Sequence, residues 1–179
     1  MARMLATIVA CLAVLVLEGC AAAVVKDSTG SSLRVAPEAR KSVVLNITGS
    51  TDSTTAKDWE AFRGEWRDAM KDAATAATLG YSFQDGEPKP TGENGTLVAI
   101  YVDDYRYLSP GLRYAVGVMA GNAYVESKAR FIDLKSGTVF GERKYSTSSH
   151  FIEGIFSAMT RKQLDAICKE ILADMAADQ

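Results

Sequence analysis

Alternating and continuous apolar positions predict the first two strands of this chain. Residues 43–47 read Val-Val-Leu-Asn-Ile and end at the turn Thr-Gly-Ser, so we expect a buried first strand there. Residues 82–95 are interrupted repeatedly by glycine and proline, which predicts an exposed loop. From Thr96 to Leu108 apolar and polar residues then alternate, which predicts a second strand with two chemically different faces.

A hairpin is the next predicted unit. Residues 122–133 and 138–145 both alternate, and Lys-Ser-Gly at 135–137 supplies a glycine where a tight turn needs a positive φ. Residues 115–121, which precede this hairpin, are apolar and contain two glycines. They predict either a buried crossover or an exposed hydrophobic loop used in assembly.

Apolar residues at intervals of three and four predict two amphipathic helices, from about Trp59 to Ala77 and from about Phe151 to Ala176. The first stripe consists of Trp59, Phe62, Trp66, Met70, Ala73 and Ala77. The second consists of Ile152, Ile155, Phe156, Met159, Leu164, Ile167, Cys168, Ile171, Leu172 and Met175. We expect the two helices to pack beside each other on one face of the sheet.

In order, these elements predict an α+β fold: a small, mostly antiparallel sheet with two long amphipathic helices on one face, ordered strand, helix, strand, strand, strand, helix. We expect a single domain over residues 41–179, a length that suits one core. Residues 20–40 include the polar stretch Asp27–Ser32 and the helix breaker Pro37, which predicts a flexible tether. The alternative is that Leu33 to Val35 already form an edge strand.

Residues 1–19 have the composition of a secretory signal peptide. Arg3 precedes an apolar run from Met4 to Leu17, and a small residue stands just before a cysteine. The fourteen residues of that run span about 21 Å as a helix, which is short of the roughly 30 Å hydrocarbon core of a bilayer. We therefore expect a cleaved signal and not a permanent transmembrane helix.

The sequence Leu-Glu-Gly-Cys at residues 17–20 resembles the lipobox of bacterial lipoproteins. The resemblance implies cleavage after Gly19 and acylation of Cys20, on its thiol and on its new amino group, by chains such as palmitate. Two or three acyl chains anchor a protein stably. Ala21 implies sorting to the outer membrane, with the domain on the periplasmic face. The alternative is ordinary secretion with cleavage within residues 21–23, which would leave the protein free in the periplasm.

A second resemblance involves residues 129–139, which read Ala-Arg-Phe-Ile-Asp-Leu-Lys-Ser-Gly-Thr-Val. This stretch resembles a hairpin in an uncharacterised family of bacterial envelope lipoproteins that combine a lipobox with a small α/β domain. In the order of its elements the chain also resembles envelope-assembly domains such as the curli-secretion lipoprotein. Both resemblances imply an envelope role, and neither implies a particular activity.

Charge and cysteine content exclude some partners and bonds. The formal net charge is -2 and the basic residues are scattered among acidic ones, so no basic patch indicates a nucleic acid. Cys11 leaves with the signal and Cys20 is the acylation site, so Cys168 alone remains as a thiol. We therefore expect no intramolecular disulfide. Cys168 lies on the apolar stripe of the last helix, which predicts a small buried hydrophobe.

The candidate partner-binding residues lie on the strand predicted at 96–108, where alternation places them on a single face. They are Tyr101, Asp103, Tyr105 and Tyr107. Such a face could dock a peptide or a glycan, and the alternative is an ordinary half-exposed sheet surface. Asp103 and Asp104 point to opposite faces unless a bulge intervenes, so we do not expect them to act as a pair.

Residues with catalytic potential form no recognisable constellation. His150 is the single histidine, and it stands beside two serines without an orienting acid or a GxSxG elbow. One histidine and one free cysteine do not supply a typical zinc site, and no glycine pattern for a nucleotide is present. We expect no catalytic activity, no metal and no cofactor.

The sequence therefore favours a lipid-anchored periplasmic protein of the bacterial cell envelope, an accessory or assembly factor that binds a protein partner. One alternative is a periplasmic carrier of a lipid or small ligand, with residues 115–121 lining its pocket. The other is a small envelope hydrolase, which requires a polar cleft that joins His150 to distant acids such as Asp103.

Overall fold

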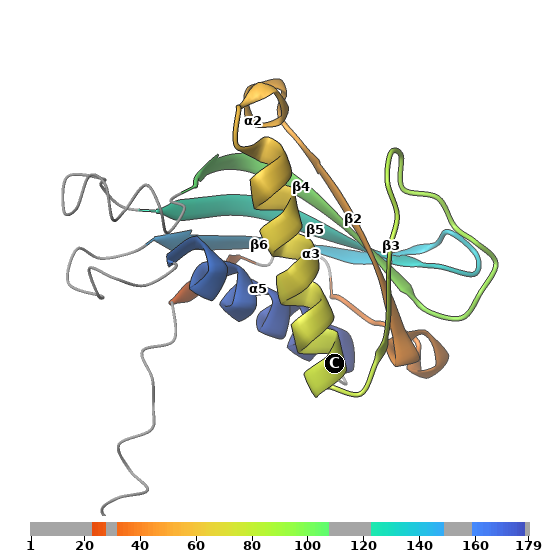
Figure 1. The fold of residues 1–179 in the computed structure, drawn as a ribbon. Helices are drawn as coiled ribbons and strands as arrows, with labels where there is room; N and C mark the ends of the chain where they lie inside the picture. Colours follow the sequence, from red (N-terminus) through yellow and green to blue (C-terminus); the bar gives the residue numbers. More distant parts are fainter. Residues whose placement is uncertain (1–22, 28–31, 108–122, 149–158, 178–179) are drawn as a thin grey trace, which may run out of the picture.

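The computed structural model describes residues 23–27, 32–107, 123–148 and 159–177. They form an α+β fold with a six-stranded mixed sheet (Figure 1). The strands are β1 (Val24–Asp27), β2 (Ser42–Gly49), β3 (Gly80–Phe83), β4 (Thr96–Arg106), β5 (Tyr124–Asp133) and β6 (Val139–Ser148). Their order in the sheet is β1-β6-β5-β4-β2-β3, and the first three pairings are antiparallel while the last two are parallel. The predicted fold class is confirmed, and the predicted hairpin is β5-β6.

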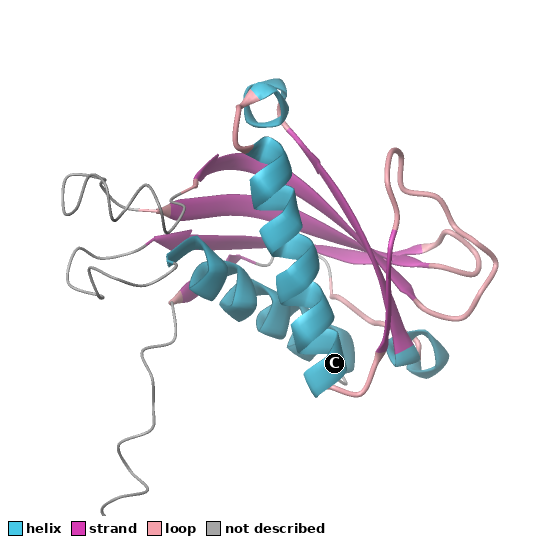
Figure 2. Cartoon of the chain, in the orientation of Figure 1, coloured by secondary structure: helices cyan, strands magenta, loops and turns pink. Residues whose placement is uncertain are grey.

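Two long helices cover one face of the sheet (Figure 2). They are α3 (Trp59–Ala76) and α5 (Met159–Ala176), and the short helices η1 (Pro37–Lys41) and α2 (Thr51–Thr55) flank β2. Phe62, Trp66 and Met70 of α3 have no exposed surface, and they pack in the same core as Ile167 of α5. The predicted helices are confirmed over these ranges, and residues 151–158 of the second prediction lie outside the described residues.

The parallel pairings follow from the connections between strands. Antiparallel neighbours need only a tight turn, whereas parallel neighbours need a crossover. Helices α2 and α3 form the crossover from β2 to β3 on one face. The loop at residues 84–95 forms the crossover from β3 to β4, where the side-chain amide of Asn46 donates to the carbonyl oxygens of Gln84 and Gly86, both at 2.9 Å. We call the sheet face opposite α3 and α5 the open face.

The open face carries a second, smaller apolar cluster at the end where the 84–95 loop crosses. Its buried members are Val44, Leu97, Ile132 and Leu134. The backbone N–H groups of Thr91 and Gly92 donate to the carbonyl oxygen of Leu134 at 3.0 and 3.1 Å, which fixes the loop against this cluster. The remainder of the open face is polar, as described below.

The structure corrects the prediction of a flexible tether over residues 20–40. Val24–Asp27 pairs with β6 as an edge strand, and Leu33 and Val35 lie in the main core, 1% and 3% exposed. Leu33 packs against Gly141, where an added Cβ would lie 3.2 Å from the Leu33 Cα atom. Residues 32–36 have no regular secondary structure, so the alternative of an edge strand at 33–35 is also wrong. None of the helices described here is long and apolar enough to cross a membrane.

Candidate functional site

A β-bulge in β4 divides the predicted tyrosine face. Val102 pairs with Ser127 of β5 and Asp104 pairs with the next residue, Glu126, which leaves Asp103 without a partner in the ladder. One additional residue reverses the alternation of every side chain beyond it. Tyr101 and Asp103 therefore lie on the open face, whereas the tyrosines that follow the bulge turn toward the helices.

Tyr105 and Tyr107 pack against α3, so the prediction that they share an exposed face with Tyr101 is wrong. The ring of Tyr105 stacks on Phe62 with centroids 4.0 Å apart, and its hydroxyl donates to Asp58 Oδ1 at 2.6 Å. Burial, followed by that hydrogen bond, raises the pKa of Tyr105. The rings of Tyr107 and Phe62 pack in a T-shaped arrangement, with their centroids 6.3 Å apart. These two tyrosines complete the core at the start of α3.

On the open face, Tyr101 and Asp103 share a basic neighbour. Lys128 Nζ lies 2.6 Å from Asp103 Oδ1 and 5.7 Å from the centroid of the Tyr101 ring. The hydrogen bond to Asp103 is the main reason that the pKa of Lys128 is raised. Tyr101 is 42% exposed, more than any other aromatic side chain that the structure describes on this face. Half of the predicted partner-binding set therefore remains available to a partner.

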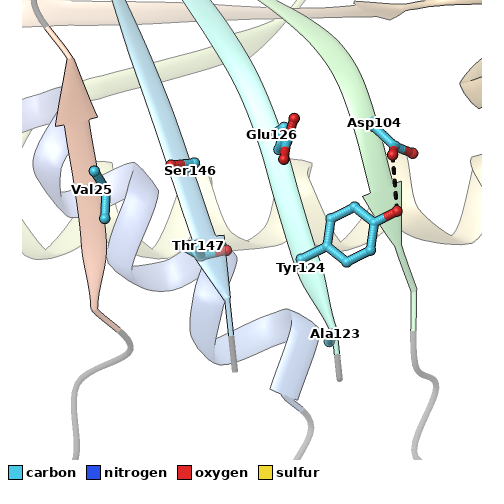
Figure 3. A pocket seen from close by; sticks show the side chains of 7 residues that line it. All are labelled: Val25, Asp104, Ala123, Tyr124, Glu126, Ser146 and Thr147. Carbon is cyan, nitrogen blue, oxygen red and sulfur yellow. Dashed lines mark hydrogen bonds between the residues drawn. The ribbon is translucent and has the colours of Figure 1, made fainter. Parts of the chain in front are cut away.

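The sequence did not predict the residues that complete this surface. Two adjoining depressions of about 470 and 590 Å³ lie across β1, β6, β5 and the bulge of β4, and Figure 3 shows the first. We call them together the open-face groove. Its polar and charged lining residues include Asp27, Asp103, Asp104, Tyr124, Glu126, Lys128, Lys144 and Ser146. Val25, 64% exposed, is an apolar residue of its lining.

The bulge also places Asp103 and Asp104 on the same face, contrary to expectation. Asp104 Oδ2 accepts a hydrogen bond from the Tyr124 hydroxyl at 2.9 Å, which is the first cause of the raised pKa of Tyr124 (Figure 3). Glu126 stands directly opposite Asp104 in the ladder. Like charges directly opposite in a sheet destabilise it, so this carboxylate pair favours a basic group above it.

The chemistry of the groove suits recognition better than catalysis. It is shallow and open, and its lining holds carboxylates, two lysines and hydroxyls, without a nucleophile paired to a base. Among the described residues, no group of three or more His, Cys, Asp or Glu could hold a metal ion. Cys168 is buried with no exposed surface, as predicted, and burial raises the pKa of its thiol.

Several predicted features lie outside the described residues. They are the cleavage site at Gly19, the acylation site at Cys20, the apolar stretch 115–121 and His150. The lipid-anchor, carrier and hydrolase hypotheses each depend on one of them. Within the described part of the chain, the open-face groove is the candidate functional site.

Comparison with known proteins places the fold. No family model matches the chain, and no curated protein matches it. The PelC dodecamer from Paraburkholderia phytofirmans is 16% identical at a TM-score of 0.50, with 88% of this chain and 99% of that chain covered. A variant of the same protein gives 17% identity and a TM-score of 0.49, with 88% and 98% covered. A Xanthomonas campestris protein of family DUF330 is 11% identical at a TM-score of 0.45, with 78% of this chain and 89% of that chain covered. At 16% identity the likeness to PelC is one of fold alone.

Proposed function

We propose that this chain is a lipid-anchored accessory protein of the bacterial envelope, which binds a protein partner through the open-face groove and catalyses no reaction. The observation that carries the proposal is the charged, shallow groove across four strands, on the face that α3 and α5 leave free. Charged groups arranged across a surface give specificity to association with a protein, whereas small ligands favour concave, mostly apolar pockets.

The anchor rests on the sequence. The apolar run that ends at Gly19 and Cys20 resembles a lipoprotein signal, and acylation at Cys20 would hold the domain at the outer membrane. A fold shared with PelC, which was solved as a dodecamer, accords with a role in an assembly. A second copy of this chain is one of the protein partners that the proposal includes.

The groove indicates the charge of the partner. Asp104 and Glu126 face each other across the ladder, and the neighbouring Lys128 pairs with Asp103. A lysine or arginine from the partner would relieve their repulsion and gain hydrogen bonds to charged oxygens. Val25, which lines the groove, and Tyr101, whose ring lies next to Lys128, supply apolar contact area. The partner we propose therefore offers a basic side chain flanked by apolar ones.

Site-specific photocrosslinking in the native envelope tests this proposal. A photoreactive amino acid at Tyr101 should form a discrete adduct with one protein, whereas the same probe at Lys71, exposed on α3, should not. The Asp104→Arg substitution should abolish the Tyr101 adduct, because it places a like charge against the partner's basic group. An adduct of equal yield at Lys71, or one that persists in Asp104→Arg, would refute the groove as the binding surface.

A further inference from the structure

The first strand of the sheet begins very close to the proposed acylation site. Strand β1 begins at Val24, and the preceding residue, Ala23, is exposed. Only residues 21–23 therefore separate the strand from Cys20. A fully extended chain advances at most about 3.6 Å per residue. The α-carbon of Cys20 can therefore lie no more than about 14 Å from that of Val24. This reach is roughly half of the ~25 Å expected for a flexible tether of about twenty residues.

The pairing of β1 shows which end of the sheet lies near the anchor. Val24 is opposite Thr147 and Asp27 is opposite Lys144, so β1 starts at the end of the sheet where β6 finishes. Tyr124, at the start of β5, and Arg106, at the finish of β4, pair at the same end. We call it the anchor end. The turn between β5 and β6 forms the opposite end, which we call the turn end (Figure 1).

We propose that the membrane surface lies against the anchor end, with the strands directed away from the bilayer and the turn end farthest from it. This inference rests on the lipid anchor proposed above and adds an orientation to it. The chain enters β1 at the anchor end and runs toward the turn end. A short anchor therefore keeps the anchor end close to the bilayer. Because β5 has ten residues, the turn end stands about 33 Å farther out.

The long edge of the sheet beside β1 fits a membrane surface less well. There Lys26 is held by Glu170 at 2.7 Å and by Asp174 at 3.2 Å, both on α5. One lysine against two carboxylates leaves this cluster acidic, and anionic headgroups repel it. Farther along, Leu33 packs against Gly141 of β6, so the chain after β1 already covers this edge.

The orientation limits where a partner can bind. A domain held within about 14 Å of its anchor cannot reach far into the periplasm. The open-face groove, near the anchor end, would stand close to the bilayer and roughly parallel to its normal. A partner that enters the groove must therefore itself be at the membrane.

Labels along β5 measure this orientation directly. Glu126 and Arg130 of β5 and Lys135 of the turn after it are exposed and follow one another from the anchor end to the turn end, with about 23 Å of strand between Glu126 and the end of β5. Each is replaced by Cys in the full acylated chain and labelled with a thiol-reactive donor dye. Buried Cys168 does not compete for the dye, since the pKa of its thiol is raised. Energy transfer is then measured to a headgroup-labelled lipid in phosphatidylethanolamine and phosphatidylglycerol vesicles.

Transfer should be highest from position 126, lower from 130 and lowest from 135. As a matched control, about ten Gly and Ser residues inserted after Ala23 should flatten this gradient, because they lengthen the reach of the anchor. An acylated protein with equal transfer at all three positions, or with the reverse order, would overturn the orientation and leave the anchor standing. A protein whose intact mass includes no acyl groups would overturn both the orientation and the anchor.

Discussion

At the scale of single residues, Asp103 decides which tyrosines lie on the open face. As the additional residue of the β4 bulge, it keeps Tyr101 on the open face and turns Tyr105 onto Phe62. The alternation of apolar and polar residues cannot reveal such a reversal, because Tyr is found on both buried and exposed sheet faces. Asp103 and Asp104, two adjacent polar residues in an alternating strand, were the available signal.

Substitution of the two tyrosines should separate these environments. Tyr105→Ala should lower the free energy of unfolding by about 2 kcal/mol or more, because it removes a stacked, partly buried ring. Tyr101→Ala should change it by less than about 0.5 kcal/mol, as is typical of exposed positions. Urea denaturation of both variants measures the difference. Equal losses would place both rings in the same environment and contradict the bulge.

At the scale of elements, the long periodic segments could be predicted from the sequence and the short ones could not. Helix α3, the β5-β6 hairpin and strands β2 and β4 each have an apolar pattern that repeats over several residues. Strand β1 has four residues, three of which are exposed, so it has no such pattern. The four-residue β3 alternates between exposed and half-buried positions, and its place beside β2 follows from the helical crossover. Local sequence does not encode such long-range pairings.

Leu33 tests the correction made to the tether. Leu33→Ala should cost about 2–4 kcal/mol of unfolding free energy, because a fully buried leucine loses its contacts and leaves a cavity. Arg34→Ala, at the exposed neighbouring position, should cost less than about 0.5 kcal/mol. Thermal and urea denaturation provide the comparison. A Leu33→Ala protein as stable as the Arg34→Ala protein would mean that this segment is a tether after all.

At the scale of the whole molecule, buried tyrosines should make the fold sensitive to alkali. Burial raises the pKa of Tyr81 to about 12, and burial together with a hydrogen bond to Asp174 raises the pKa of Tyr145. Unfolded tyrosines lose their protons near pH 10. Above that pH the unfolded chain binds fewer protons than the folded one, so the free energy of unfolding should fall as the pH rises from about 10 toward 12.

Tyr145→Phe isolates one contribution to this fall. At neutral pH it should cost about 1 kcal/mol, the usual value of one hydrogen bond. Above pH 10 its stability should fall less steeply than that of the wild type, by up to about 1.4 kcal/mol per pH unit, because one ionisable group is gone. Guanidinium denaturation at several pH values gives both slopes. Identical slopes would show that the folded state does not hold the Tyr145 proton.

Together, the fold, the groove and the proposed anchor lead to the proposal of a domain held close to a membrane, with the open face accessible. In the sequence, residues 17–20 predict the anchor, whereas the proposed proximity to the membrane depends on the position of Val24 at the start of the sheet. The groove could not be predicted, since β1, the bulge and the hairpin meet there from distant parts of the chain.

The most direct test of the central claim is the intact mass of the protein expressed in a bacterium, measured together with its membrane fractionation. We predict a mature chain that begins at Cys20, carries the mass of two or three acyl chains and sediments with the outer membrane. Cys20→Ala should lose both the acyl mass and the sedimentation. A soluble wild-type species without acyl mass, cleaved within residues 21–23, would contradict the lipid-anchored account.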